Sequence, residues 1–250
     1  MANITHKWDR ICVVSCTHAR YADKQAFAEL VNFRDRWCKG KNDVVAHIGD
    51  WVDLTALMGS GAGEGEPLAP DVDTGLTHLR MYRPTILMAG NHEARAYRLR
   101  DSNKATTAWA AHKIVEAMEE CAAKLKAPLL PYRGAFETYR VADCLLTHGS
   151  VYGEQSCRDM AEMYCTNEIR KVLFGHTHRV GIASARTMVG GTAYNIGSLT
   201  KRASLEYSLS RRATFAWNLG FAWGEVCRSL NQSQINIATC EDGATFRLPV

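Results

Sequence analysis

The sequence lacks any run of about 20 apolar residues, the length that a membrane-spanning helix needs. The N-terminal segment is polar, and the apolar run after it is too short for a secretory signal. The sequence also lacks a large excess of either charge. Its 30 basic and 26 acidic residues leave a formal net charge of +4, which neither indicates nor opposes nucleic-acid binding. These absences predict a cytoplasmic protein with no membrane partner.

The nine cysteines do not form the even set that a disulfide framework needs. Several lie in apolar runs, as Cys12, Cys144 and Cys227 do, which is typical of reduced core residues. Internal repeats and linkers are also lacking, and 46% of the residues are hydrophobic. The 250 residues are therefore expected to form one domain with a sizeable core, and the oligomeric state stays open.

Apolar runs and helical spacing alternate along the first two thirds of the chain, with Asp23 as the expected N-cap of the first helix. Helices are expected at 23–41, 74–82, 93–126 and 158–169. Strands are expected at 10–16, 43–49, 85–90, 135–141, 144–149, 171–178, 179–189, 191–198, 213–219, 221–226 and 235–248, the last with a turn at 241–243. Helix-interleaved strands followed by antiparallel ones indicate an α/β fold.

Polar residues of metal-binding type follow five of the apolar runs. Residues at the carboxyl ends of neighbouring strands meet at one edge of a sheet, and imidazole, carboxylate, thiolate and amide groups together suit transition metals. One such histidine would more often be an ordinary core or surface residue, but five such segments in one chain predict a metal site. The segments contain Cys16 and His18, Asp50 and Asp53, Asn91 and His92, His148, and His176 and His178.

The order and spacing of these segments resemble the calcineurin-like metallophosphoesterase superfamily. Its motifs are Asp-x-His, Gly-Asp-x-x-Asp, Gly-Asn-His-Glu/Asp, a lone His and Gly-His-x-His, and four of the five match fully here. "GDWVD" and "GNHE" are closer to the phosphatase branch than to the nucleases, and "NIGS" at 195–198 resembles the segment that often follows the last motif. The resemblance implies a four-layer sandwich of two mixed β-sheets flanked by helices, with insertions at about 55–84 and 93–127 of a single domain 1–250.

The resemblance also implies two metal ions about 3.5 Å apart that share a hydroxide, which attacks phosphorus in line. Carried over by position, Cys16, His18 and His178 hold the first metal, Asn91, His148 and His176 hold the second, and Asp50 bridges them. His92 then protonates the leaving oxygen, and Asp53 orients and charge-stabilises His92 unless it is only a loop cap.

Cys16 stands where the family has an aspartate. A thiolate keeps the negative charge but is softer, which favours zinc or iron at the first site, with manganese an option at the second. The alternative is a weakened first site that leaves one metal or none. Because the other motif residues are intact, Cys16 is interpreted as a ligand.

Leu54 and Thr55 replace the Arg-Gly pair that follows Gly-Asp-x-x-Asp in phosphoprotein phosphatases, which disfavours that substrate class. Arg95 and Arg179 are the candidates for binding the substrate phosphate, with a solvated surface role as the alternative. The predicted function is hydrolysis of a phosphate mono- or diester, with nucleotides among the candidate substrates.

Two further functions stay open. One is a DNA or RNA exonuclease of the same superfamily, with basic residues in 95–104 along the nucleic-acid backbone. The other is a non-catalytic metal-binding scaffold, which the presence of His92 disfavours. The Gly-rich segment 58–70 lacks the ending of a phosphate-binding P-loop, and with 93–126 it is hypothesised to form a lid or wall that sets substrate size.

Overall fold

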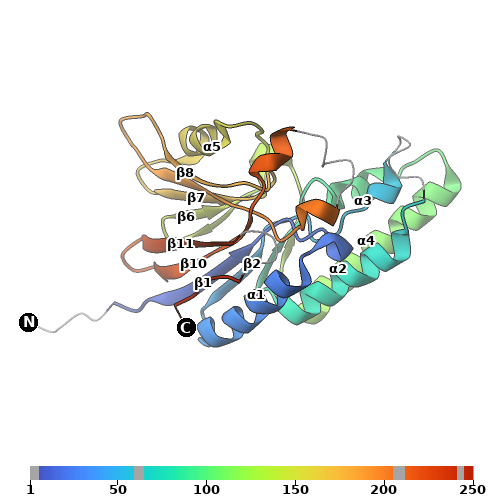
Figure 1. The fold of residues 1–250 in the computed structure, drawn as a ribbon, viewed down its shortest axis with the longest axis horizontal. Coiled ribbons are helices and arrows are strands. Elements are labelled where there is room, and N and C mark those ends of the chain that lie inside the picture. The colour runs from blue at the N-terminus through green and yellow to red at the C-terminus, as the bar shows by residue number, and fades with distance from the viewer. Residues whose placement is uncertain (1–5, 59–64, 205–211, 241–244, 250) are drawn as a thin grey trace, which may run out of the picture.

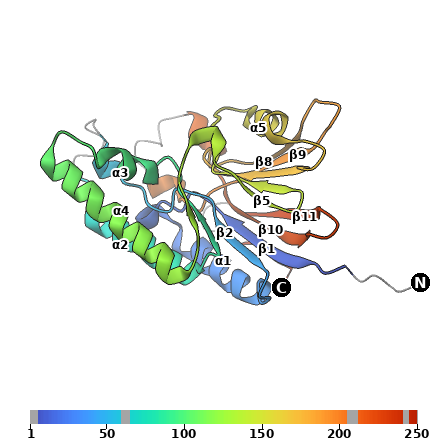
Figure 2. The same ribbon diagram turned by 180° about the vertical axis from the view of Figure 1, so that it is seen from behind.

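The computed structural model describes residues 6–58, 65–204, 212–240 and 245–249. Its strands form two mixed sheets that pack face to face (Figures 1 and 2). One sheet has six strands in the order β11-β10-β1-β2-β3-β4, and the other has five in the order β5-β6-β7-β9-β8. The predicted α/β class with two mixed sheets is confirmed.

The six-stranded sheet consists of β1 (Asp9–Val14), β2 (Val44–His47), β3 (Ile86–Met88), β4 (Leu129–Leu130), β10 (Leu219–Cys227) and β11 (Gln232–Cys240). The five-stranded sheet consists of β5 (Tyr139–Val141), β6 (Cys144–Leu146), β7 (Lys171–Phe174), β8 (Val180–Ser184) and β9 (Thr192–Ile196). The helices are α1 (Lys24–Trp37), α2 (Leu68–Tyr82), α3 (Glu93–Leu99), α4 (Ala105–Leu125) and α5 (Ser156–Tyr164).

Strand β1 shows why its sequence is apolar from Ile11 to Val14. Ile11 and Val13 pack against Leu173 in the core between the sheets, while Cys12 and Val14 pack on the opposite side with the residues of α1. Successive side chains point to opposite faces of a sheet, so residues 11–14, which are covered on both faces, are all buried.

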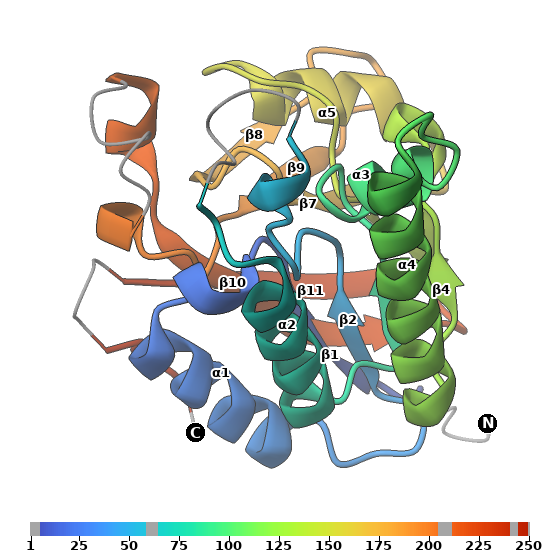
Figure 3. The ribbon, with the colours of Figure 1, turned by 90° about the vertical axis from the view of Figure 1, so that its right-hand side faces the viewer.

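Helices cover both outer faces. Helices α1, α2 and α4 lie side by side over the six-stranded sheet (Figure 3), and α5 packs on the five-stranded sheet. The result is the four-layer arrangement expected from the sequence, with one layer of helices on each side of the paired sheets.

Several local expectations are confirmed and others are wrong. The Asp23 carboxylate caps α1 by accepting a hydrogen bond from Ala26 N. The expected helix 93–126 is two helices, α3 and α4, because Lys104 is extended where α4 begins. Helix α5 ends at Tyr164 because Thr166 Oγ1 accepts hydrogen bonds from two backbone N–H groups that follow it.

Near the C-terminus the expected strand 213–219 is wrong, since Arg212–Ala216 form a short 3₁₀ helix and β10 begins at Leu219. Helix α2 begins earlier than expected, at Leu68, and β4 was not expected at all. The turn expected at 241–243 and residues 59–64 of the Gly-rich segment lie outside the described residues.

Candidate metal centre

The five motif segments all follow the carboxyl ends of strands. Strands β1, β2 and β3 are adjacent and parallel in one sheet, and β6 and β7 are adjacent and parallel in the other. Their carboxyl ends therefore lie at one edge of each sheet, and the two edges meet. This arrangement brings together all seven residues that the sequence predicted as metal ligands.

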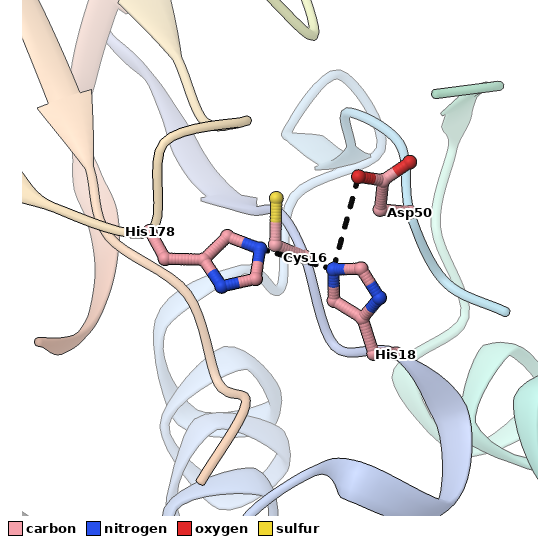
Figure 4. Close-up of side chains that lie close together, drawn as sticks. All are labelled: Cys16, His18, Asp50 and His178. Carbon is pink, nitrogen blue, oxygen red and sulfur yellow. Dashed lines mark hydrogen bonds and ion pairs between the residues drawn. The ribbon is translucent and has the colours of Figure 1, made fainter. Parts of the chain in front are cut away.

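Four of these residues form a first group at the end of β1. The potential ligand atoms of Cys16, His18, Asp50 and His178 all lie within 4.8 Å of one another, and all four residues are buried. His18 Nε2 lies 3.0 Å from His178 Nε2 and 3.7 Å from Asp50 Oδ2. Figure 4 shows both rings and the carboxylate turned toward one another, with Cys16 between His178 and Asp50.

A second group shares Asp50 with the first. His148 Nε2 lies 3.2 Å from Asp50 Oδ2 and 3.0 Å from Asn91 Oδ1. His176 Nδ1 lies 3.0 Å from the same Asn91 oxygen. The two groups thus lie on either side of one carboxylate.

The hydrogen bonds around the centre determine which ring nitrogens can face a metal. His148 Nδ1 donates to the Ile48 carbonyl over 2.9 Å, and His18 Nδ1 donates to Asp53 Oδ1 over 2.9 Å. In each ring this leaves Nε2 free to offer its lone pair to the centre, where the neighbouring atoms are themselves acceptors. A set of acceptors that face one another fits a cation, so the residues present suit the metals that the family implies.

Burial sets the charges of the metal-free centre. It raises the pKa of the Cys16 thiol well above its ordinary value, and the Asp50 charge adds to this. Burial would also raise the pKa of Asp50, but the imidazoles of His148 and His92 outweigh it and hold that pKa well below the ordinary value. Burial lowers the pKa of His176 to about 4. A metal that binds Cys16 would therefore displace the thiol proton.

The backbone around the centre is held in an uncommon conformation. Cys16, His18, Asp50, His176 and His178 all have positive φ angles, between 46° and 65°. Such left-handed residues mark functional sites, because the surrounding structure must stabilise them. Two glycines of the motifs allow the loops of the centre to pack closely. A Cβ at Gly90 would clash with Asp50, and one at Gly175 would clash with Ser15.

His92 and Asp53 lie beside the first group. His92 Nδ1 donates to the Asp53 carbonyl oxygen over 2.5 Å and lies 3.3 Å from its carboxylate. Burial lowers the pKa of His92, but the charges of Asp50 and Asp53 outweigh this, so its pKa is raised. Asp53 also contacts His18, a contact that the sequence did not suggest.

The two predicted substrate arginines differ in position. The Arg95 guanidinium donates to the Asp53 carbonyl over 2.9 Å, and its other terminal nitrogen lies 3.2 Å from His92 Nε2. Arg95 therefore lies directly beside His92 and Asp53. Arg179 follows His178 directly in the chain and is half-buried immediately before β8.

Two carboxylates that the sequence analysis did not single out hold the loops of the centre. Glu93 is fully buried and accepts hydrogen bonds from the N–H groups of Asp50, Val52 and Gly90. Glu93 is the last residue of "GNHE", so its motif position was the available signal. Asp71 accepts from the N–H groups of Asp53 and Leu54, and nothing in the sequence around it on α2 suggests this role.

These features define an α/β sandwich protein with a buried cluster of potential metal ligands where its two sheets meet. The chain belongs to the calcineurin-like phosphoesterase family, which it matches over residues 9–180. The resemblance inferred from the motifs is thereby confirmed. A comparison with curated proteins finds no match.

Three solved structures resemble the chain over most of its length at low identity. A hypothetical protein from Thermus thermophilus is 15% identical, with a TM-score of 0.48, over 93% of this chain and 99% of its own. A single mutant of Vps29 from Entamoeba histolytica is 12% identical, with a TM-score of 0.40, over 93% and 99%. A protein serine/threonine phosphatase from Saccharomyces cerevisiae is 13% identical, with a TM-score of 0.40, over 95% and 81%.

Within the described part of the chain, no helix has both the length and the apolar character needed to cross a membrane.

Proposed function

We propose that this chain is a metal-dependent hydrolase of phosphate mono- or diesters that works with two metal ions. The observation that carries the proposal is the shared Asp50: one ligand group lies on its His18 side and another on its His148 side. A carboxylate between two ligand groups can bridge two ions. When bound, two such ions would supply Lewis acidity and a hydroxide nucleophile at neutral pH.

Each metal position has its own ligand chemistry. Cys16, His18, Asp50 and His178 would hold the first ion, and the thiolate favours zinc or iron there. Asp50, Asn91, His148 and His176 would hold the second, where nitrogen and oxygen ligands alone also suit manganese.

His92 is the proposed general acid. Its Nδ1–H group donates a hydrogen bond to the Asp53 carbonyl, so the proton for the leaving oxygen would be held at Nε2. The carboxylates of Asp50 and Asp53, 4.0 Å and 3.3 Å from the ring nitrogens, stabilise the charged imidazolium that carries this second proton.

Arg95 is the first candidate for binding the phosphate that is hydrolysed. Its guanidinium already lies against His92 Nε2. A planar guanidinium group can bind two oxygens of one phosphate through two parallel hydrogen bonds. A phosphate that engages Arg95 would draw it away from His92 Nε2. Arg179 is the second candidate, because of its position next to His178.

The test is hydrolysis by protein reconstituted with zinc, iron, manganese or nickel, with p-nitrophenyl phosphate and bis(p-nitrophenyl) phosphate as substrates. We expect turnover of at least one ester, and the preferred ester distinguishes monoesterase from diesterase. His92→Ala should reduce this turnover, whereas His112→Ala, on the exposed side of α4, should not. A wild-type protein that binds metal but does not exceed the His92→Ala background on either ester would favour the scaffold function.

A further inference from the structure

A pocket lies beside helix α3, next to the metal centre. Its volume is about 310 Å³, at the small end of the range for ligand pockets, and we call it the α3 pocket. Two arginines and three apolar residues line it: Leu57, Met58, Arg95, Arg98 and Leu99. Among the described residues that line it there is no carboxylate, so its lining is positively charged.

Arg95 joins the α3 pocket to the proposed catalytic residues. One terminal nitrogen of its guanidinium lies 2.9 Å from the Asp53 carbonyl and the other lies 3.2 Å from His92 Nε2, and the same side chain lines the pocket. A substrate whose phosphate lies at the metal centre could therefore extend its leaving group past His92 into the pocket.

Arg98 has a charge that the rest of the described chain does not neutralise. It lies one helical turn after Arg95, so both residues are on the same face of α3. The described residues give Arg98 neither a hydrogen-bond partner nor an ion-pair partner, and its side chain is exposed. Arg100, by contrast, donates to the Tyr97 carbonyl and stacks on the Tyr97 ring.

Arg98 shares the α3 pocket with Arg95, and a terminal nitrogen of Arg95 lies 3.2 Å from His92 Nε2. The unpaired guanidinium therefore lines the same pocket that Arg95 joins to the proposed catalytic residues.

We propose that the α3 pocket is a leaving-group subsite, in which Arg98 binds a second anionic group of the substrate. The preferred substrate would then be a phosphate ester whose leaving group has a compact apolar framework and carries a further phosphate or carboxylate. The apolar framework would pack on Leu57, Met58 and Leu99. This inference rests on the proposed phosphoesterase function, which it extends by naming a substrate class.

The experiment compares two pairs of compounds that differ by one carboxylate. For turnover the pair is phenyl phosphate and para-carboxyphenyl phosphate, measured as kcat/KM. For binding the pair is phenylphosphonate and para-carboxyphenylphosphonate, which cannot be hydrolysed, measured by calorimetry on the metal-reconstituted protein. The variants are Arg98→Gln, Arg98→Lys and, as the matched control on the same surface, Arg100→Gln.

We expect wild type to prefer the carboxylate compound in both pairs, and Arg98→Gln to reduce this preference about fivefold, the scale of an exposed ion pair. Arg98→Lys should retain part of the preference, and Arg100→Gln should retain all of it. Hydrolysis with no preference, or with a preference that Arg98→Gln leaves unchanged, would overturn the subsite while the proposed function stands. An Arg98-dependent binding preference without hydrolysis of any ester would support the subsite and overturn the hydrolase.

Discussion

The Asp53 carboxylate accepts a hydrogen bond from His18 Nδ1 over 2.9 Å. The same oxygen lies 3.3 Å from Nδ1 of His92, so one carboxylate orients both a metal-ligand candidate and the proposed general acid. Orienting carboxylates of this kind influence the affinity of a metal site as well as its chemistry.

Asp53→Asn should therefore weaken metal binding and catalysis together. We expect about a 10- to 100-fold loss of affinity at the first site, because the neutral amide holds the His18 ring less firmly in its metal-binding orientation. Competition with a chelator measures the affinity, and kcat measures the effect on His92. Asp73→Asn, exposed on α2, is the control. If metal affinity were unchanged and kcat reduced, Asp53 would act only through its contact with His92 and not through His18.

His92→Gln should slow poor leaving groups more than good ones. General acid catalysis is typically worth about 10²- to 10⁴-fold, and it matters most when the leaving oxygen is strongly basic. We expect a larger loss of kcat with phenyl phosphate than with p-nitrophenyl phosphate, at unchanged metal content. Equal losses on the two esters would assign His92 a role other than proton donation.

Cys16→Asp should shift the first site from soft metals toward hard ones. A carboxylate restores the ligand typical of the family and removes the preference of a thiolate for zinc or iron. We expect manganese to compete better in the variant, as measured by elemental analysis after exposure to equal metal concentrations. Cobalt offers a spectroscopic check, because a cobalt–thiolate absorption band should be present in wild type and absent in Cys16→Asp. Its absence in wild type would mean that Cys16 is not a ligand.

His47 should make the metal-free protein sensitive to acid. It is buried, and burial lowers its pKa from 6.5 to about 3, so below pH 6.5 the unfolded chain binds a proton there that the folded protein does not. The stability that neutral His47 contributes is therefore complete above pH 6.5 and is lost as the pH falls toward 3. Between pH 7 and pH 4 the loss is up to about 3 kcal/mol.

Urea denaturation of metal-free wild type and His47→Gln at these two pH values measures this effect. The pH dependence should be shallower in His47→Gln and unchanged in His112→Gln. An equally steep dependence in His47→Gln would assign the acid sensitivity to the other buried histidines.

Glu93→Ala should destabilise the protein through its loops. The substitution leaves three buried N–H groups, those of Asp50, Val52 and Gly90, without their acceptor. We expect a loss of about 3 kcal/mol in the free energy of unfolding, with a smaller loss in Glu93→Gln, which keeps one acceptor oxygen. Glu116→Ala, exposed on α4, is the control and should change little. A loss in Glu93→Ala no larger than in the control would show that solvent replaces these hydrogen bonds.

Much of the site could be predicted from local sequence, because the motif residues follow strands directly. An apolar run predicts a buried strand, and the residue after it lies at the sheet edge whatever the details of packing. The grouping of His148 and His176 with Asn91 came from the family resemblance, because these residues follow strands of two different sheets. The predicted strand 213–219 failed because its apolar residues, such as Phe215, occur in a short 3₁₀ helix, and a short apolar run has no unique period.

The sequence by itself determined the family, the order of the motifs and the types of candidate ligand, including the thiol of Cys16. Only the tertiary structure decided that Asp53 contacts His18 as well as His92, and that Leu57 and Arg98 line one pocket. The physical reason is that strand ends converge through backbone hydrogen bonding, which follows a simple pattern. Side-chain contacts between distant loops and helices depend on how whole elements pack, and no local pattern encodes that packing.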